Sequence, residues 1–137
     1  MRGVFKVGIA LAALTVLMSS RDAQAIDLTG AWASRADLCN QVFVRKGRAK
    51  EIGFTPLSEQ HGGGFIVEAN QLRGKFAKCR IKSRKEDGET LNIIAGCATD
   101  IMLSNVQFSL KMLGPDKISR TFPGMPDMEI SYYRCSI

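Results

Sequence analysis

The chain has 137 residues, of which 45% are hydrophobic and 23% charged, and its formal net charge is +6 at pH 7. A chain of this length builds one compact domain around one core, which leaves no room for a separate catalytic lobe. We find no internal repeat, low-complexity tract or linker.

Residues 1–25 have the pattern of a secretory signal peptide. Arg2 and Lys6 supply a positive start, residues 7–18 form an apolar core, and Ala23-Gln24-Ala25 gives a small-x-small cleavage site. An apolar run this short does not span a bilayer. We therefore expect a bacterial periplasmic or secreted protein that is not membrane-spanning, with residues 26–137 as its single mature domain. Without the signal, 16 basic and 12 acidic residues remain, a net charge of +4.

The rest of the chain is dominated by short runs in which apolar and polar residues alternate, the pattern of half-buried strands. In one of them Val106, Phe108 and Leu110 alternate with polar residues. Turn residues separate the runs, with a strong hairpin signal at Asp87-Gly88. No segment has convincing helical spacing. The predicted strands are 28–34, 41–46, 50–55, 64–68, 71–85 with a bend near Gly74, 90–98, 104–113, 117–122 and 128–134.

This order of about eight or nine sequential strands predicts an all-β fold. We expect a small antiparallel meander barrel, because closure of the sheet removes its exposed edges. A two-sheet sandwich is the alternative. The stretch 58–63 between two predicted strands is polar and rich in glycine, and we interpret it as a flexible surface loop.

Four cysteines lie after the signal, at Cys39, Cys79, Cys97 and Cys135. They lack the close pairs of a zinc site, and no C-x-x-C-H motif for haem occurs, so two disulfides are expected in an oxidising compartment. Cys79 and Cys97 flank the Asp87-Gly88 turn almost symmetrically. An even register would place them side by side and leave Cys39 for Cys135, whereas an odd register would leave the other two connectivities open.

Two short patches resemble the lipocalin and calycin barrels. Gly30-Ala31-Trp32 is a G-x-W motif near the start of the first strand, and Arg134 lies in the last strand. The resemblance implies that Gly30, Trp32 and Arg134 close one end of a lipocalin-like barrel, with the arginine lying across the indole. The length and cysteines are more similar to small periplasmic barrels that inhibit metalloproteases or lysozyme. Similar motifs also occur in exported bacterial proteins without an assigned function.

The strongest candidate binding feature is a basic stretch that contains seven cations and no acid. Strand alternation predicts that Lys78, Arg80, Lys82 and Arg84 share one face, opposite Cys79. Such a face could bind a polyanion, although lysines on an outer strand also simply keep a sheet soluble. Export and the lack of interleaved aromatic residues exclude nucleic acid as a partner. The candidate anion-binding face is Arg73, Lys75, Lys78, Arg80, Lys82, Arg84 and Lys85.

Catalytic and metal motifs are weak. His61 begins an H-G-G-G sequence like the oxyanion loop of some esterases, but the G-x-S-x-G nucleophile motif is missing. No two acids have the spacing of a shared carboxylate site. Met125 and Met128, with Met102 or His61, could offer soft ligands to Cu(I), but such pairs are common by chance. We expect no enzyme activity, no cofactor and no metal.

These patterns favour an exported, non-enzymatic binding module, of the type that inhibits an envelope or foreign hydrolase. The first alternative is a carrier or sensor of a small amphipathic or anionic ligand, held at the mouth of the barrel. Such a ligand requires a pocket of at least about 300 Å³. The second alternative is a structural cell-envelope protein that uses the basic face as its contact surface. The expected partner is therefore a protein target or an anionic envelope component. The aromatic residues expected to line a pocket are Phe43, Phe54, Phe65, Phe108 and Tyr132.

Overall fold

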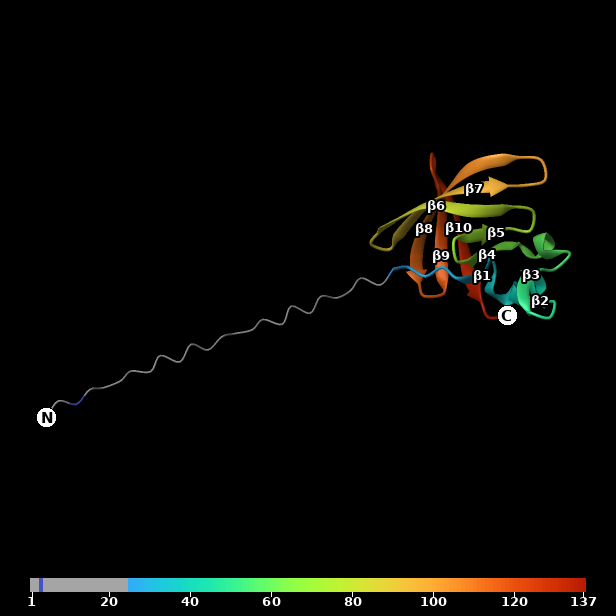
Figure 1. The fold of residues 1–137 in the computed structure, drawn as a ribbon, viewed down its shortest axis with the longest axis horizontal. Helices are drawn as coiled ribbons and strands as arrows, with labels where there is room; N and C mark the ends of the chain where they lie inside the picture. Colours follow the sequence, from blue (N-terminus) through green and yellow to red (C-terminus); the bar gives the residue numbers. More distant parts are fainter. Residues whose placement is uncertain (1–2, 4–24) are drawn as a thin grey trace.

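The computed structural model describes residue 3 and residues 25–137, and the predicted signal peptide lies almost entirely outside this part (Figure 1). Eight antiparallel strands form a closed barrel in the order β1-β10-β9-β8-β7-β6-β5-β4. The predicted all-β barrel is therefore confirmed. The barrel strands are β1 (Gly30–Ala33), β4 (Gly64–Glu68), β5 (Gln71–Arg73), β6 (Lys78–Asp87), β7 (Thr90–Ala98), β8 (Leu103–Gly114), β9 (Lys117–Phe122) and β10 (Met125–Cys135).

Strand β1 closes the barrel. It pairs on one side with β10, placing Trp32 opposite Arg134, and on the other side with β4, placing Trp32 opposite Phe65. All other neighbours in the barrel are consecutive along the chain. Closure through β1 excludes the two-sheet sandwich.

The segment between β1 and β4 leaves the barrel wall. It contains the 3-10 turns η1 (Ala36–Leu38) and η2 (Ser58–His61), the short helix α1 (Cys39–Val42) and the hairpin of β2 (Phe43–Lys46) and β3 (Glu51–Phe54). The predicted strands 41–46 and 50–55 therefore exist, but they form a separate two-stranded sheet. Helix α1 was not predicted because four residues are too few to reveal a helical period.

Two apolar cores follow from the alternation of the β1 side chains. Trp32 points into the barrel, where it packs with Leu91, Ile93 and Leu110. Its neighbours Ala31 and Ala33 belong to a second core outside the barrel wall, together with Val42 and Phe43. The small alanine side chains let α1 and β2 approach the wall closely. Strand β1 thus contributes side chains to the barrel interior on one face and to the packing of α1 and β2 on the other.

Both disulfides have the connectivity that an even hairpin register implies. Cys79 and Cys97 are direct partners across β6 and β7, and they are bonded. Cys39 is bonded to Cys135, which ties α1 to the end of β10. The turn between β6 and β7 passes through Gly88, whose φ of 60° is a conformation that glycine adopts readily.

Candidate ligand-binding cavity

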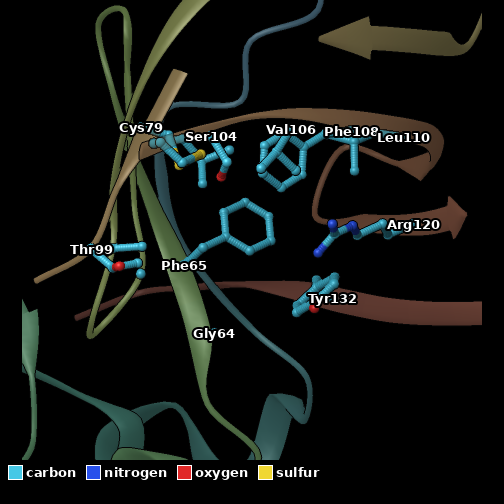
Figure 2. A pocket seen from close by; sticks show the side chains of 14 residues that line it. Gly64, Phe65, Cys79, Thr99, Ser104, Val106, Phe108, Leu110, Arg120 and Tyr132 are labelled. Atoms are coloured by element: carbon cyan, nitrogen blue, oxygen red, sulfur yellow. A yellow bond between two sulfur atoms is a disulfide. The ribbon is translucent and has the colours of Figure 1, made fainter. Parts of the chain in front are cut away.

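A cavity of about 350 Å³ lies in the barrel and opens at one end. Its walls are mostly apolar, and they include the Cys79–Cys97 disulfide. Figure 2 shows Phe65 near the middle of the view, with Val106 and Phe108 on one side of its ring. The lining residues are Gly64, Phe65, Leu72, Gly74, Ala77, Cys79, Cys97, Thr99, Ser104, Val106, Phe108, Leu110, Arg120 and Tyr132.

The predicted aromatic lining is correct for three of five residues. Phe65, Phe108 and Tyr132 line the cavity, and the rings of Phe65 and Tyr132 meet edge to face with centroids 4.9 Å apart. The prediction is wrong for Phe43 and Phe54. These two rings pack against each other in the outer core, because β2 and β3 lie outside the barrel.

Arg120 is the one charged residue among the described residues that line this cavity. It lies on β9 opposite Leu110 of β8, which is buried in the inner core, and its guanidinium points into the cavity beside Tyr132 (Figure 2). The guanidinium carbon lies 4.6 Å from the ring centre of Phe108 and 4.6 Å from that of Phe122. The cation is therefore held between two aromatic rings at the inner wall.

The Arg120 side chain lacks an acceptor. Its Nε is buried without a hydrogen-bond partner, and within residues 25–137 no carboxylate forms an ion pair with it. Arg120 as a whole is half-buried, and a charge that is partly shielded from water without a partner is costly. Cation–π contacts with two rings offset part of that cost. The terminal nitrogens of the guanidinium point into the cavity, and they are the donors that an anionic group there would meet.

Sequence reasoning missed Arg120, although a signal was present. On β9 the apolar residues Ile118 and Phe122 alternate with Ser119 and Thr121, and Arg120 falls in the apolar phase. A cation at an inward-facing strand position is unusual enough to indicate a site.

The basic face is less continuous than strand alternation predicts. A β-bulge between Ile81 and Ser83 adds Lys82 to β6 and shifts the pairing. Arg84 consequently lies opposite Ile93, an inward-facing residue, and it bonds to Glu86 and to the carbonyl of Ile26. The prediction that Arg84 shares a face with Lys78 and Arg80 is therefore wrong.

Two more members of that face already have partners. Arg73 pairs with Glu68 at 3.0 Å and donates to the carbonyl of Ile52 at 2.8 Å. Lys75 pairs with Glu59. Lys78, Arg80 and Lys85 remain exposed, and Lys82 donates to Asn105 at 2.9 Å. The continuous ribbon of seven cations is thus divided into separate groups.

A second hollow, of about 590 Å³, lies beside the β2–β3 hairpin and is lined by Lys46, Arg73 and Lys75 among others. Each of these cations donates a hydrogen bond to a backbone carbonyl, those of Phe54, Ile52 and Pro56 respectively. Arg73 and Lys75 also pair with Glu68 and Glu59, so two of the three cations of this hollow are already neutralised, whereas Arg120 pairs with no carboxylate among the described residues.

The residues expected to close the barrel do meet at its other end. Arg134 lies over the Trp32 ring, and the Trp32 indole donates to the carbonyl of Leu28 at 2.8 Å. Gly30 has a φ of 127°, and a Cβ there would lie 3.5 Å from Nη1 of Arg134. This end of the barrel is consequently filled, and access to the cavity is from the opposite end.

The remaining candidates from the sequence concern catalysis and metal binding. His61 is half-buried and is the last residue of η2, a 3-10 turn in the connection between β3 and β4. Within the described part of the chain, no group of three or more His, Cys, Asp and Glu side chains could hold a metal ion. Among the same residues, no helix is long and apolar enough to cross a membrane.

No protein-family profile, no curated protein and no solved structure matches this chain. The resemblance to lipocalins and calycins therefore stays a prediction.

Proposed function

We propose that the protein binds a small amphipathic anion in the barrel cavity, acting as its carrier or sensor outside the cytoplasm. The observation that carries the proposal is the Arg120 guanidinium, which points into a mostly apolar cavity and pairs with no carboxylate within residues 25–137. A carboxylate would accept from the guanidinium, while its apolar body would pack on Phe65, Val106 and Leu72. The two disulfides support a site of action in an oxidising compartment.

The cavity volume limits the size of the ligand. At the ~30 Å³ that one water molecule takes in the liquid, 350 Å³ holds about twelve non-hydrogen atoms. A ten-carbon fatty acid such as decanoate has this size. The volume is close to the lower end of the range of about 300–1,000 Å³ for small-molecule pockets. Longer chains would have to extend through the mouth of the barrel.

The cavity favours this carrier or sensor function over the inhibitor-type module. An inhibitor acts through an exposed surface and gains nothing from an inward-facing cation. A purely structural protein would be better served by a barrel packed with apolar side chains throughout.

The test is calorimetric titration with three ligands of equal chain length and different head groups: decanoate, decanol and decyltrimethylammonium. We expect decanoate to bind at least about tenfold more tightly than decanol, because a hydrogen bond to a charged group contributes about 1.5–3 kcal/mol. The cationic ligand should not bind. Arg120→Met should abolish the preference for decanoate. The matched control, Arg80→Met, removes an exposed cation from the outer wall and should leave it unchanged.

Equal affinity for decanoate and decanol would contradict the proposal, as would an Arg120→Met variant that binds decanoate like the original protein. Native mass spectrometry of protein purified gently and without reduction provides the complementary measurement. An added mass of a few hundred daltons that disappears in Arg120→Met would identify the cargo.

A further inference from the structure

The open end of the barrel carries an unusual concentration of exposed apolar side chains. The segment 74–77 connects β5 to β6, and the segment 99–102 connects β7 to β8. We call these two segments, with Leu103, the mouth loops. Phe76 is 72% exposed, Ile101 93%, Met102 58% and Leu103 83%. These are the four most exposed large apolar side chains of the described residues, and all four lie in the mouth loops.

The mouth loops are neighbours in space. Lys78, the first residue of β6, pairs with Ala98, the last residue of β7, so the two connections start from adjacent positions. Residues from both loops also line one groove of about 410 Å³, including Gly74, Phe76 and Asp100. These four most exposed apolar side chains therefore lie at one end of the molecule. A cluster of this kind marks an interaction site more often than single exposed residues do.

Residues 99–102 form a hydrogen-bonded turn, which we call the tip. The amide of Thr99 donates to the carbonyl of Met102 at 2.9 Å, and the Thr99 hydroxyl accepts from the amides of Ile101 and Met102 at 3.4 and 3.1 Å. These bonds fix the backbone of the tip while its side chains point to the outside. The exposure of Ile101 is thus a property of a defined turn.

The same loops frame the entrance to the cavity. Gly74, Ala77, Thr99 and Ser104 line the cavity, and each is in a mouth loop or one residue beyond it. A partner that binds the mouth loops would therefore lie next to the entrance through which a ligand enters or leaves the cavity.

The shape and charge of this end fit a phospholipid surface. The apolar residues project from convex turns, which suits a deformable acceptor into which single side chains can insert. Residues 73–78 and 98–103 contain three cations and one acid, Asp100. Arg73 and Lys75 are paired with acids of neighbouring elements, so Lys78 is the cation most available to a lipid phosphate. Lys78 beside an apolar tip matches the order of head group and acyl chain in a bilayer, and the net charge of +4 of residues 26–137 favours an anionic one.

We infer that the mouth loops dock on the surface of an anionic phospholipid bilayer, with Phe76, Ile101 and Leu103 inserted among the lipids. The cavity then opens onto the membrane, and an amphipathic anion passes between the bilayer and Arg120. The second step rests on the proposed function, whereas the docking itself does not.

The test is sedimentation with vesicles of phosphatidylethanolamine and phosphatidylglycerol in equal parts. The protein used begins at Ile26, so the apolar segment 7–18 cannot itself bind lipid, and it retains every strand and both disulfides. We expect the original protein to sediment with the vesicles. Ile101→Ser and Leu103→Ser should each weaken vesicle binding by about tenfold or more, because each removes a side chain that inserts among the lipids. Asp100→Asn should strengthen it, because it removes the only acid of the loops.

Leu113→Ser is the matched control. Leu113 lies on the same strand as Leu103, near the opposite end of the barrel, and is 46% exposed. Its replacement should leave vesicle binding unchanged. Because all these positions are exposed, urea midpoints should agree among the variants, and this agreement verifies that folding is intact.

The outcomes separate the two proposals. If the original protein binds decanoate in solution but neither it nor any variant binds vesicles, the docking inference is overturned and the cavity function stands. If vesicles bind and decanoate does not, docking stands without the ligand. Arg120→Met should keep full vesicle binding. The lipid assignment would also be overturned if the protein does not bind vesicles and is a dimer that Leu103→Ser converts to a monomer. The apolar side chains of the mouth loops would then mediate self-association.

Discussion

The guanidinium carbon of Arg134 lies 4.4 Å from the ring centre of Trp32, across the β1–β10 pair that closes the barrel. The same side chain donates to the carbonyls of Asp27 at 2.9 Å and Pro115 at 3.2 Å, and it pairs with Asp116 at 3.2 Å. One residue therefore connects the segment before β1, the turn between β8 and β9, and the last strand. This network stabilises the closed end through contacts that are distant in sequence.

Arg134→Ala should accordingly lower the free energy of unfolding by about 2–4 kcal/mol, because it removes a cation–π contact and several hydrogen bonds together. Urea denaturation followed by Trp32 fluorescence measures this loss. Arg80→Ala, on the outer wall, serves as the control and should change stability by less than about 0.5 kcal/mol. A similar small effect for both variants would show that the network contributes little.

The two disulfides should differ in their contribution to stability. Cys39–Cys135 joins residues 96 positions apart, whereas Cys79–Cys97 joins residues 18 positions apart in a hairpin with extensive pairing. In the chain-entropy account, a longer loop gives a larger effect on the unfolded state. We expect Cys39→Ala/Cys135→Ala to cost about 4–5 kcal/mol and Cys79→Ala/Cys97→Ala about 3 kcal/mol. The reverse order in urea denaturation would contradict this ranking.

Local alternation was sufficient to predict most strands, since β4, β7 and β9 agree with the predicted 64–68, 90–98 and 117–122. It was not sufficient to say where each strand belongs. Phe43 and Phe54 alternate as barrel residues would, but they pack in the outer core because α1 and the hairpin lie over Ala31 and Ala33. That placement depends on contacts between distant segments, which periodicity does not encode.

The site was harder to predict than the fold for two physical reasons. A single extra residue, Lys82, moves Arg84 from the predicted outer face to the inner register, and a bulge has no clear sequence signature here. The cavity itself is volume left unfilled by side chains from seven strands, which no local pattern specifies. Arg120 was the exception, because a cation in the apolar phase of β9 could have been recognised from the alternation alone.

Gly64 should tolerate no side chain. A Cβ at this position would overlap the carbonyl oxygen of Trp32 and would lie 2.9 Å from Cζ of the buried Phe43. Neither neighbour can move without disturbing β1 or the outer core, so Gly64→Ala should cost at least about 2 kcal/mol. Gly96→Ala is the matched control, since its Cβ would meet the flexible end of Lys82 at 2.8 Å and would lie at an ordinary contact distance of 3.8 Å from Oδ1 of Asn105. Its cost in urea denaturation should stay below about 1 kcal/mol.

The contact between Glu59 and Lys75 should make part of the stability depend on pH. The hydrogen bond from Lys75 lowers the pKa of Glu59 below its ordinary value of 4.5. Because the folded pKa is the lower one, this contribution is present above pH 4.5 and is lost as the pH falls through the lowered pKa. Between about pH 5 and 3, the urea midpoint of Glu59→Gln should therefore decrease less than that of the original protein. An equal decrease of the urea midpoint between about pH 5 and 3 in the two proteins would contradict this role of Glu59.

Arg120 and Arg134 both lie against aromatic rings, but their replacement should change stability in opposite directions. Arg134 has an acceptor for each of its nitrogens, while Nε of Arg120 has none. Arg120→Met removes a half-buried charge that pairs with no carboxylate among the described residues, and it keeps an apolar side chain in its place. The free energy of unfolding of the ligand-free protein, measured by urea denaturation, should therefore stay equal or rise by up to about 2 kcal/mol. Decanoate at about one hundred times its dissociation constant should stabilise the original protein by about 2.7 kcal/mol and the variant not at all. A variant that is less stable than the original protein without ligand would assign Arg120 to the architecture of the barrel instead of to binding.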